Sequence, residues 1–341
     1  MPPRTRATLS EIAAAAGVSV PTVSKVVNGR PDVAPGTRER VEEVLRQRSY
    51  RPRRAQPERR VGLIDLVFAD LGSPWAMEIL SGVEEVAHRA GTGVVVSAVH
   101  GRHRHRPDRS WLENLAARRS DGVLLILSQL SPGQQALLDE LGIPVVIVDP
   151  AGQPAPGVPS VGAANWAGGL AATEHLIGLG HERIAVVGGP TDVLCSRARV
   201  DGYRAAMSSA GHKVRPGYVR TGDFVSIGGY AETMALLDLA QPPTAIFVCS
   251  DQMALGAYEA LYERGLRTPD DISIVGFDDL DEARWAVPPL TTVRQPLTEM
   301  AGLATRMLLT LINGEELETP RVELATPLVV RSSTAPPPAA R

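Results

Sequence analysis

The pattern of apolar residues near the N-terminus predicts two short helices joined by a tight turn. One helix face repeats at intervals of three and four residues: Leu9, Ile12, Ala13 and Ala16. Thr8 and Glu11 have the form of a capping box at its start, and Gly17 can end it. Ser19 can cap a second helix whose inner face is Val23, Val26 and Val27. Such a helix-turn-helix places its second helix in the major groove of DNA.

Further along the chain, the pattern changes from helices to alternating strands and helices. A third helix is predicted from Thr37 to about Gln47, and residues 50–60 read as a linker with two prolines and five arginines. The expected strands are 61–68, 93–98, 122–127, 144–148, 183–188, 244–249 and 272–276. The expected helices lie near 76–90, 110–118, 132–141, 166–179, 199–210, 228–239, 253–264 and 297–312. Apolar strands separated by helices are typical of parallel sheets covered on both faces. The sequence therefore predicts an α/β protein with a helix-turn-helix head and two doubly wound parallel-sheet subdomains.

Charge is unevenly distributed along the 341 residues. Residues 1–60 hold 13 Lys and Arg against 6 Asp and Glu, whereas the remainder holds 22 against 32. A basic head on an acidic body indicates that the head binds a polyanion. The alternative for a basic N-terminus is a solvated tail, which the helix-turn-helix pattern within it disfavours.

The composition indicates a cytoplasmic protein. No apolar run reaches the roughly 18 residues that a membrane-spanning helix needs, and the arginine-bearing N-terminus lacks the apolar core of a secretory signal. Cys195 and Cys249 are the only cysteines, so the chain has no disulfide framework. We therefore expect no membrane partner.

Neither a cofactor nor a metal is expected. His100, His103 and His105 alternate with arginines in one hydrophilic loop, where positive charge opposes a cation. The segment Gly188-Gly189-Pro190 lacks the G-x-G-x-x-G dinucleotide fingerprint. An α/β enzyme would need a phosphate loop and an acid–base constellation, and neither is visible in the sequence. An extracytoplasmic sugar-binding protein would share the body but not the basic head.

Several motifs, in the same order along the chain, carry a family resemblance. The head contains TLSEIAAAAGVSVPTVSKVVNG and TRERVEEVLRQRSYRP. The body contains SVGAANWAGGLAATEHLIGLGHERIAVVGGP, SRARVDGYRAAM, PTAIFVCSDQMALGAYEAL, DISIVGFDD and PPLTTVRQPLTEMA. Over residues 7–332 the chain resembles the LacI/GalR family of transcriptional regulators. VGLIDLVF with LGSPWAMEI is similar to the actinobacterial branch that governs the uptake of plant polysaccharides and oligosaccharides.

This resemblance implies a domain plan. It implies a helix-turn-helix domain over 1–49, a hinge over 50–60, and a body over 61–332 that is similar to a periplasmic binding protein. The N-subdomain is expected over about 61–160 and 293–318, and the C-subdomain over about 161–292 and 319–332. The proline-rich residues 333–341 read as a disordered tail.

The resemblance also implies a function. Family members form homodimers on palindromic operators and sense small metabolites, most often sugars. We therefore expect a repressor of carbohydrate uptake or catabolism genes that binds double-stranded operator DNA and a sugar or oligosaccharide. A regulator that responds to a purine or a nucleoside is the alternative, and an activator of the same class stays open.

The residues expected to contact DNA lie on the helix-turn-helix and the hinge. They are Thr8, Ser19, Val20, Pro21, Thr22, Ser24, Lys25, Asn28, Arg30, Tyr50, Arg53 and Arg54. Val20 and Pro21 offer only apolar contact, whereas Lys25 can reach a guanine edge. Thr22, Ser24 and Asn28 suit phosphate contacts, with ordinary helix capping as the alternative for Thr22 and Asn28.

The hinge departs from the family pattern. Gly62 follows Tyr50 by only twelve residues, and no leucine lies between them. The family's leucine wedge in the minor groove therefore has no counterpart here. Arg53 and Arg54 can enter a narrow minor groove instead, or the segment is a plain basic linker.

The residues expected to bind the effector follow the predicted strands, because ligands of such sheets bind beyond the carboxyl ends of the strands. They are Ser73, Trp75, Trp166, Arg199, Phe224, Ser250, Asp251, Asp278 and Gln295. Arg199 matches the family's Arg-x-x-Gly motif, which implies that it donates to sugar hydroxyls or to a carboxylate. Trp75 and Phe224 read as stacking platforms, and Trp166 as a platform or a core residue. Capping of the next helix is the alternative for Asp278.

Overall fold

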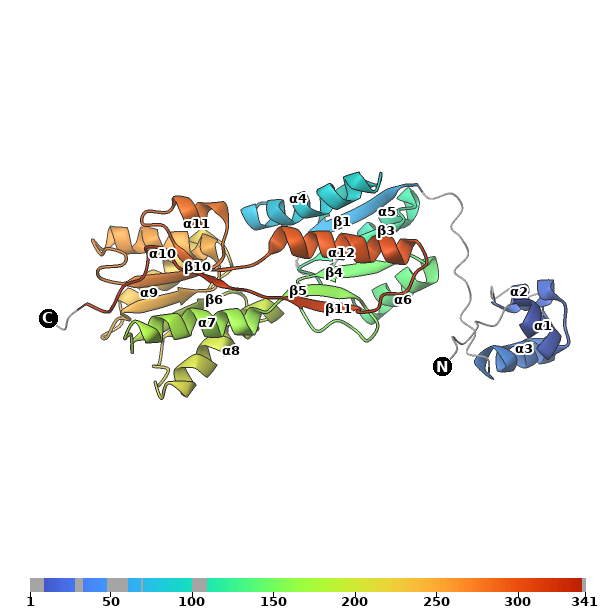
Figure 1. The fold of residues 1–341 in the computed structure, drawn as a ribbon, viewed down its shortest axis with the longest axis horizontal. Coiled ribbons are helices and arrows are strands. Elements are labelled where there is room, and N and C mark those ends of the chain that lie inside the picture. The colour runs from blue at the N-terminus through green and yellow to red at the C-terminus, as the bar shows by residue number, and fades with distance from the viewer. Residues whose placement is uncertain (1–8, 28–32, 48–60, 69, 100–108, 339–341) are drawn as a thin grey trace. The chain divides into compact units, whose positions relative to one another are not determined.

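The computed structural model describes residues 9–27, 33–47, 61–68, 70–99 and 109–338 (Figure 1). These residues belong to two compact units, Met1–Arg60 and Val61–Arg341. We call the first unit the head and the second the body.

The head contains the three helices that the sequence predicts. They are α1 (Leu9–Ala16), α2 (Val20–Val27) and α3 (Pro35–Gln47). Ile12, Val23 and Val41, one from each helix, are completely buried in a small common core. Gly17 adopts a left-handed backbone (φ 64°), which lets the chain turn between α1 and α2. Thr8 lies outside the described residues.

The body contains two sheets, and the first carries helices on both faces. Its six strands run in the order β11-β5-β4-β3-β1-β2, and the pairs are parallel. The strands are β1 (Leu63–Phe68), β2 (Gly93–Ala98), β3 (Gly122–Ile126), β4 (Val145–Val148), β5 (Ser160–Ala163) and β11 (Arg321–Leu324). The helices are α4 (Pro74–Arg89), α5 (Arg109–Arg118), α6 (Pro132–Leu141) and α12 (Leu297–Ile312). Leu66 packs towards α4 and α12, whereas Val67 packs towards α5 and α6. This alternation explains why β1 is apolar on both sides.

The second sheet has the order β12-β10-β9-β8-β6-β7, parallel except for the β10–β12 pair. Its strands are β6 (Ile184–Gly188), β7 (Val219–Thr221), β8 (Ala245–Val248), β9 (Ser273–Asp278), β10 (Thr291–Arg294) and β12 (Leu328–Val329). Its helices are α7 (Asn165–Gly178), α8 (Leu194–Ser209), α9 (Ser226–Leu237), α10 (Asp251–Glu263) and α11 (Asp281–Trp285). Helices α7 and α8 approach closely because Gly169 faces the backbone of Arg199, where a Cβ atom would lie 2.2 Å from the carbonyl oxygen.

The chain passes between the two sheets three times (Figure 1). The passages lie between β5 and α7, between β10 and α12, and between β11 and β12. The expected subdomain limits therefore need correction. Residues 321–324 form an edge strand of the first sheet rather than part of the C-subdomain, and residues 161–163 also belong to the first sheet.

The structure also differs from the sequence-based expectation at short elements and at the C-terminus. Strands β5, β7, β10, β11 and β12 and helix α11 were not expected, and α8 begins at Leu194 rather than near residue 199. The tail predicted as disordered is bonded to the second sheet at its start. Ser333 Oγ accepts from the Thr291 amide at 2.7 Å, and the Ala335 amide donates to Ser273 Oγ at 3.1 Å.

Candidate functional site

The second helix of the head, α2, presents the side chains expected to read DNA. Val20 is 40% exposed, and Pro21 and Lys25 are exposed as well. Thr22 is half-buried, and its amide donates to Ser19 Oγ at 3.3 Å, so Ser19 caps the helix. Ser24 lies on the same helix. Six other expected DNA contacts fall outside the described residues: Thr8, Asn28, Arg30, Tyr50, Arg53 and Arg54.

In the body, a buried arginine organises a group of polar side chains that we call the Arg199 cluster: Asp149, Asn165, Arg199, Asp278 and Gln295. Arg199 lies near the start of α8 and is 3% exposed. Its Nε donates to Asn165 Oδ1 at 2.8 Å, and its Nη1 donates to the Cys249 carbonyl at 2.7 Å. Nη1 also lies 3.6 Å from Asp278 Oδ1. The guanidinium is therefore held by three different elements.

Two aromatic rings flank the Arg199 guanidinium. Its Cζ atom lies 3.7 Å from the centroid of Phe277 and 5.9 Å from that of Phe224. Both distances are within the range of cation–π attraction. Phe224 has a left-handed backbone (φ 69°), and its ring lies against Gly189, where a Cβ atom would be 2.2 Å from the ring. The structure therefore brings together Phe224 and Arg199, two of the residues expected to bind the effector.

The carboxylates of the cluster come from both sheets. Asp149 follows β4 of the first sheet, and Asp278 ends β9 of the second. Asn165 Nδ2 lies 3.5 Å from Asp149 Oδ1 and so links this carboxyl to the group that binds Arg199. Both aspartates have a positive φ, 47° and 122°, which L residues rarely adopt. Such backbone strain is concentrated at functional sites.

Burial governs the protonation of these carboxyls. It raises the pKa of Asp278 to about 7, although the nearby Arg199 guanidinium acts to lower it. Burial also raises the pKa of Asp149, and Arg199 again opposes the shift. Near neutral pH the cluster therefore contains a carboxyl that is close to its titration midpoint.

Two buried polar atoms of the cluster have no hydrogen-bond partner among the described residues. They are Asp278 Oδ1 and Gln295 Nε2. Gln295 is 3% exposed, and its Oε1 accepts from Trp75 Nε1 at 3.0 Å. Buried polar groups are nearly always hydrogen-bonded in native proteins. A ligand that both accepts and donates hydrogen bonds would satisfy these two atoms.

Three of the expected effector residues make structural hydrogen bonds within the protein. Ser73 Oγ accepts from the Ala76 amide at 3.2 Å and caps α4, and Ser250 Oγ accepts from the Met253 amide at 3.2 Å and caps α10. Asp251 is completely buried, with one oxygen 2.6 Å from Thr292 Oγ1 and the other 2.9 Å from the Leu280 amide. Asp251 therefore joins α10 to the neighbouring strands.

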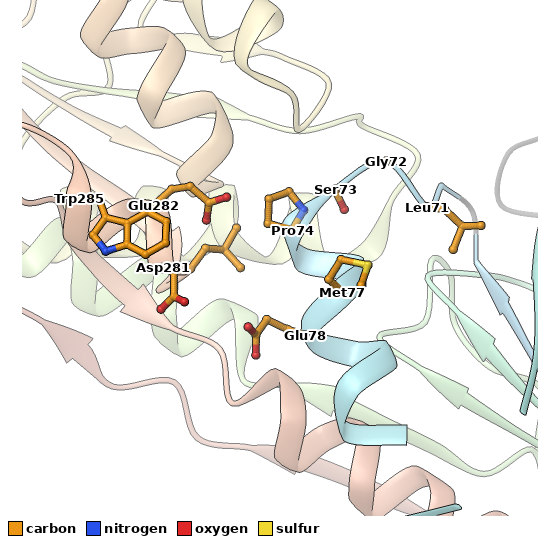
Figure 2. Close-up of a pocket in the computed structure, with 10 residues that line it drawn as sticks. Leu71, Gly72, Ser73, Pro74, Met77, Glu78, Asp281, Glu282 and Trp285 are labelled. Carbon is orange, nitrogen blue, oxygen red and sulfur yellow. The ribbon is translucent and has the colours of Figure 1, made fainter. Parts of the chain in front are cut away.

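Two pockets in the body contain residues that were expected to bind the effector. The first, of about 540 Å³, lies between the start of α4 and α11 and is shown in Figure 2. Ser73 and Glu78 border it on one side, and Asp281, Glu282 and Trp285 on the other. The second, of about 590 Å³, is lined by 17 residues that include Trp166 and three residues missed by the sequence analysis: Asp149, Asn165 and Cys195. The structure thus places Ser73 and Trp166 in different pockets, and the Trp166 pocket reaches the Arg199 cluster.

The sequence held a signal for one of the missed residues. Asp149 directly follows the predicted strand 144–148, at the edge of the sheet where ligands are expected. Asn165 follows β5, a strand that the apolar pattern did not indicate. Cys195 lies four residues before Arg199 in α8, and therefore on the same helix face. No signal beyond helical spacing pointed to it.

In the described part of the chain, no helix is both long and apolar enough to cross a membrane. The same residues contain no group of three or more His, Cys, Asp or Glu side chains that is arranged to hold a metal ion.

The head and the body each match a known protein family, and relatives match the chain over nearly its whole length. Residues 8–53 match the family of bacterial regulatory proteins described as the lacI family, and residues 173–334 match the periplasmic binding protein-like domain. The HTH-type transcriptional regulator CelR of Thermobifida fusca is 37% identical over 339 residues, which are 97% of this chain and 99% of that protein.

Two solved structures have the same fold over almost the whole chain. A transcriptional regulator CelR–cellobiose complex superposes with a TM-score of 0.74 at 36% identity, over 96% of this chain and all of the other. A lac repressor dimer bound to operator and the anti-inducer ONPF superposes with a TM-score of 0.70 at 30% identity, over 97% and 100%. Their full-length agreement matches the order of head and body found here. The chain belongs to the lacI family of bacterial regulatory proteins.

Proposed function

We propose that this protein is a homodimeric repressor of carbohydrate uptake or catabolism genes. In this proposal the head binds operator DNA, and a small neutral sugar or oligosaccharide in the body tunes that binding. The protein acts in the cytoplasm, without a cofactor and without catalytic activity.

The observation that carries the choice of a sugar is a pair of buried atoms in the Arg199 cluster, Asp278 Oδ1 and Gln295 Nε2, that have no hydrogen-bond partner among the described residues. Asp278 Oδ1 can only accept a hydrogen bond when ionised, and Gln295 Nε2 can only donate. A hydroxyl group does both, and a sugar presents several hydroxyls on a rigid ring. The hydroxyl groups of a polyol can therefore donate to Asp278 Oδ1 and accept from Gln295 Nε2.

The surroundings of the cluster support the same ligand class. The rings of Phe224 and Phe277 supply apolar faces beside the guanidinium, and Trp166 lines the pocket that reaches Asp149. Aromatic faces combined with a few fixed polar groups are typical of small-molecule sites. The similar regulator CelR was solved as a complex with cellobiose, which is a neutral disaccharide of this kind.

The head supports specific DNA binding as a dimer. Lys25 is exposed on α2, where it can reach a base edge, and residues 50–60 add five arginines that can contact the backbone. One helix-turn-helix per chain covers too little DNA for high specificity. The similar lac repressor was solved as a dimer on its operator.

The proposal is tested by titrating a sugar panel against the full-length protein, with and without operator DNA. Some monosaccharide or oligosaccharide is expected to bind and to change operator affinity by about 5- to 150-fold, with an equal reciprocal change in sugar affinity. Equal sugar affinities in the two titrations would refute control of DNA binding by the sugar. Selective binding of purines or nucleosides would instead support the alternative effector class.

A further inference from the structure

The first strand of the body is held at its start by one side chain that is distant in sequence. Asp121 Oδ1 accepts from the Val61 amide at 3.2 Å. Its Oδ2 accepts from the Gly62 amide at 2.7 Å and from the Leu63 amide at 3.3 Å. In return, the Asp121 amide donates to the Leu63 carbonyl at 2.8 Å. One residue therefore makes four hydrogen bonds to three consecutive residues.

A second carboxylate fastens the same corner from the other direction. Asp65, within β1, is completely buried and accepts hydrogen bonds from Arg118 and from Ser120 Oγ. These donors immediately precede Asp121 in the chain, and Arg119 between them has a left-handed backbone (φ 57°). In the turn from α5 to β3, the residues on both sides of Arg119 are thus hydrogen-bonded to β1.

The clamp extends beyond what the sheet itself requires. Pairing of β1 with β3 begins at Ile64, and pairing with β2 begins at Leu63. Val61 lies before both ladders, is 47% exposed, and is the first residue of the body. Asp121 therefore orders the residue that joins the body to the linker, where the sheet provides no partner.

The opposite end of β1 leads to the Arg199 cluster. After β1, the chain reaches Trp75 in the first turn of α4, and the Trp75 indole donates to Gln295. The six residues of β1 span about 20 Å as an extended strand. Strand β1 is paired with β2 on one side and β3 on the other, so it connects these two ends as a single extended element.

We propose that Asp121 is a positioning residue for allosteric coupling, because it fixes the point at which the linker leaves the body. This inference rests on the proposed function. Without the clamp, Val61 can act as extra linker, which adds up to about 3.5 Å of slack, whereas Leu63 stays paired with β2 and the Gly62 carbonyl keeps its bond from the Gly93 amide. That slack exceeds the 1–2 Å shifts that elements typically make in switching transitions. Movement at the effector site would then no longer reach the DNA-binding head.

The test uses the full-length Asp121→Asn variant, which keeps the size of the side chain but places an NH2 group against backbone donors. Asp271→Asn is the matched control, because Asp271 Oδ2 also accepts from a backbone amide, that of Arg267 at 2.8 Å, in the other half of the body. Sugar affinity is measured with and without operator DNA, and the ratio is the coupling factor. Asp121→Asn is expected to lower this factor about 2- to 30-fold. Sugar affinity without DNA should stay as in the wild type, as should all values for the control.

A second measurement needs no ligand. Hydrogen exchange of the Gly62 and Leu63 amides is expected to be about 2- to 10-fold faster in Asp121→Asn, as the loss of a hydrogen bond implies. Unchanged exchange, or a wild-type coupling factor, would overturn the role of Asp121. So would a parallel loss of sugar affinity and thermal stability, since that indicates a general structural role. If the wild type itself shows no coupling, the proposed function fails first.

Discussion

Replacing Arg199 with alanine tests whether the cluster is held together by one buried charge. The substitution removes the Nε bond to Asn165, the Nη1 bond to the Cys249 carbonyl and the ion pair with Asp278. Removing one partner of a buried ion pair typically costs about 3–5 kcal/mol, because the other charge is left without compensation. We expect a loss of unfolding free energy in this range above neutral pH, together with the loss of effector binding.

The cost should depend on pH, in a direction that the pKa of Asp278 fixes. Burial raises this pKa from 3.8 to about 7 in the folded protein, so the carboxyl's contribution to stability is fully present below pH 3.8 and is lost as pH rises through 7. Arg199 lowers the pKa of Asp278, so without it the folded-state value rises further. The variant then continues to lose stability at pH values where the wild type has levelled off. The difference between them should grow by about 1.4 kcal/mol for each unit that the pKa rises.

Urea unfolding of the wild type and the variant at pH 6 and pH 9 measures this difference. Arg204→Ala is the control, because Arg204 lies on the same helix but pairs with Asp201 at the surface, where both side chains are more than half exposed. That control is expected to change stability by less than about 1 kcal/mol at both pH values. A penalty for Arg199→Ala that is equal at the two pH values would refute the electrostatic reasoning. If calorimetry shows that Arg199→Ala binds sugar with wild-type affinity, Arg199 is not part of the effector site.

Three further substitutions test the head and the helix packing behind the cluster. Lys25→Ala should weaken operator binding by about 1–3 kcal/mol in a gel-shift titration and leave sugar affinity unchanged. If the variant binds the operator as tightly as the wild type, Lys25 does not contact the bases. Ser19→Ala should lower the stability of the head by about 0.5–2 kcal/mol in thermal unfolding, because α2 loses its cap. Gly169→Ala should destabilise the body by about 1–3 kcal/mol and weaken sugar binding, because its Cβ atom would meet the Arg199 carbonyl. Gly178→Ala on the same helix has open space and should do neither.

The apolar pattern predicted the long elements well because each of them buries a continuous face. Strand β1 and helix α12 match their expected ranges closely, since nearly every apolar residue in them reaches a core. Strands β5 and β11 escaped notice because they are four residues long and partly polar. They are strands only because β5 pairs with β4 on one side and β11 on the other. Pairing of this kind is a property of the fold and leaves no local signal.

Site residues were likewise predicted only where a long strand or a sequence motif marked their position. Arg199, Asp278 and Phe224 follow strands or carry a motif, and the structure brings them together. Asn165 was missed because the strand before it was missed. Asp251 was expected to bind the effector, but its position at the start of a buried helix gives both of its oxygens to the protein. A carboxylate after a strand can cap, brace or bind, and only the neighbours from other elements decide between these roles.

The arrangement of the Arg199 cluster explains why a ligand there would act on the whole body. Asp149 belongs to the end of the first sheet, Asp278 to the second, and Gln295 to a passage between them. Gln295 stays with the second sheet at this point, because its amide donates to the Asp278 carbonyl at 3.1 Å, so Asp149 is the carboxyl of the cluster that belongs to the first sheet. A ligand bonded to Asp149 and also to Asp278 or Gln295 would gain its full binding energy only at one spacing of the two sheets. It must therefore favour that spacing over others, and differential affinity of this kind is the physical requirement for allosteric control.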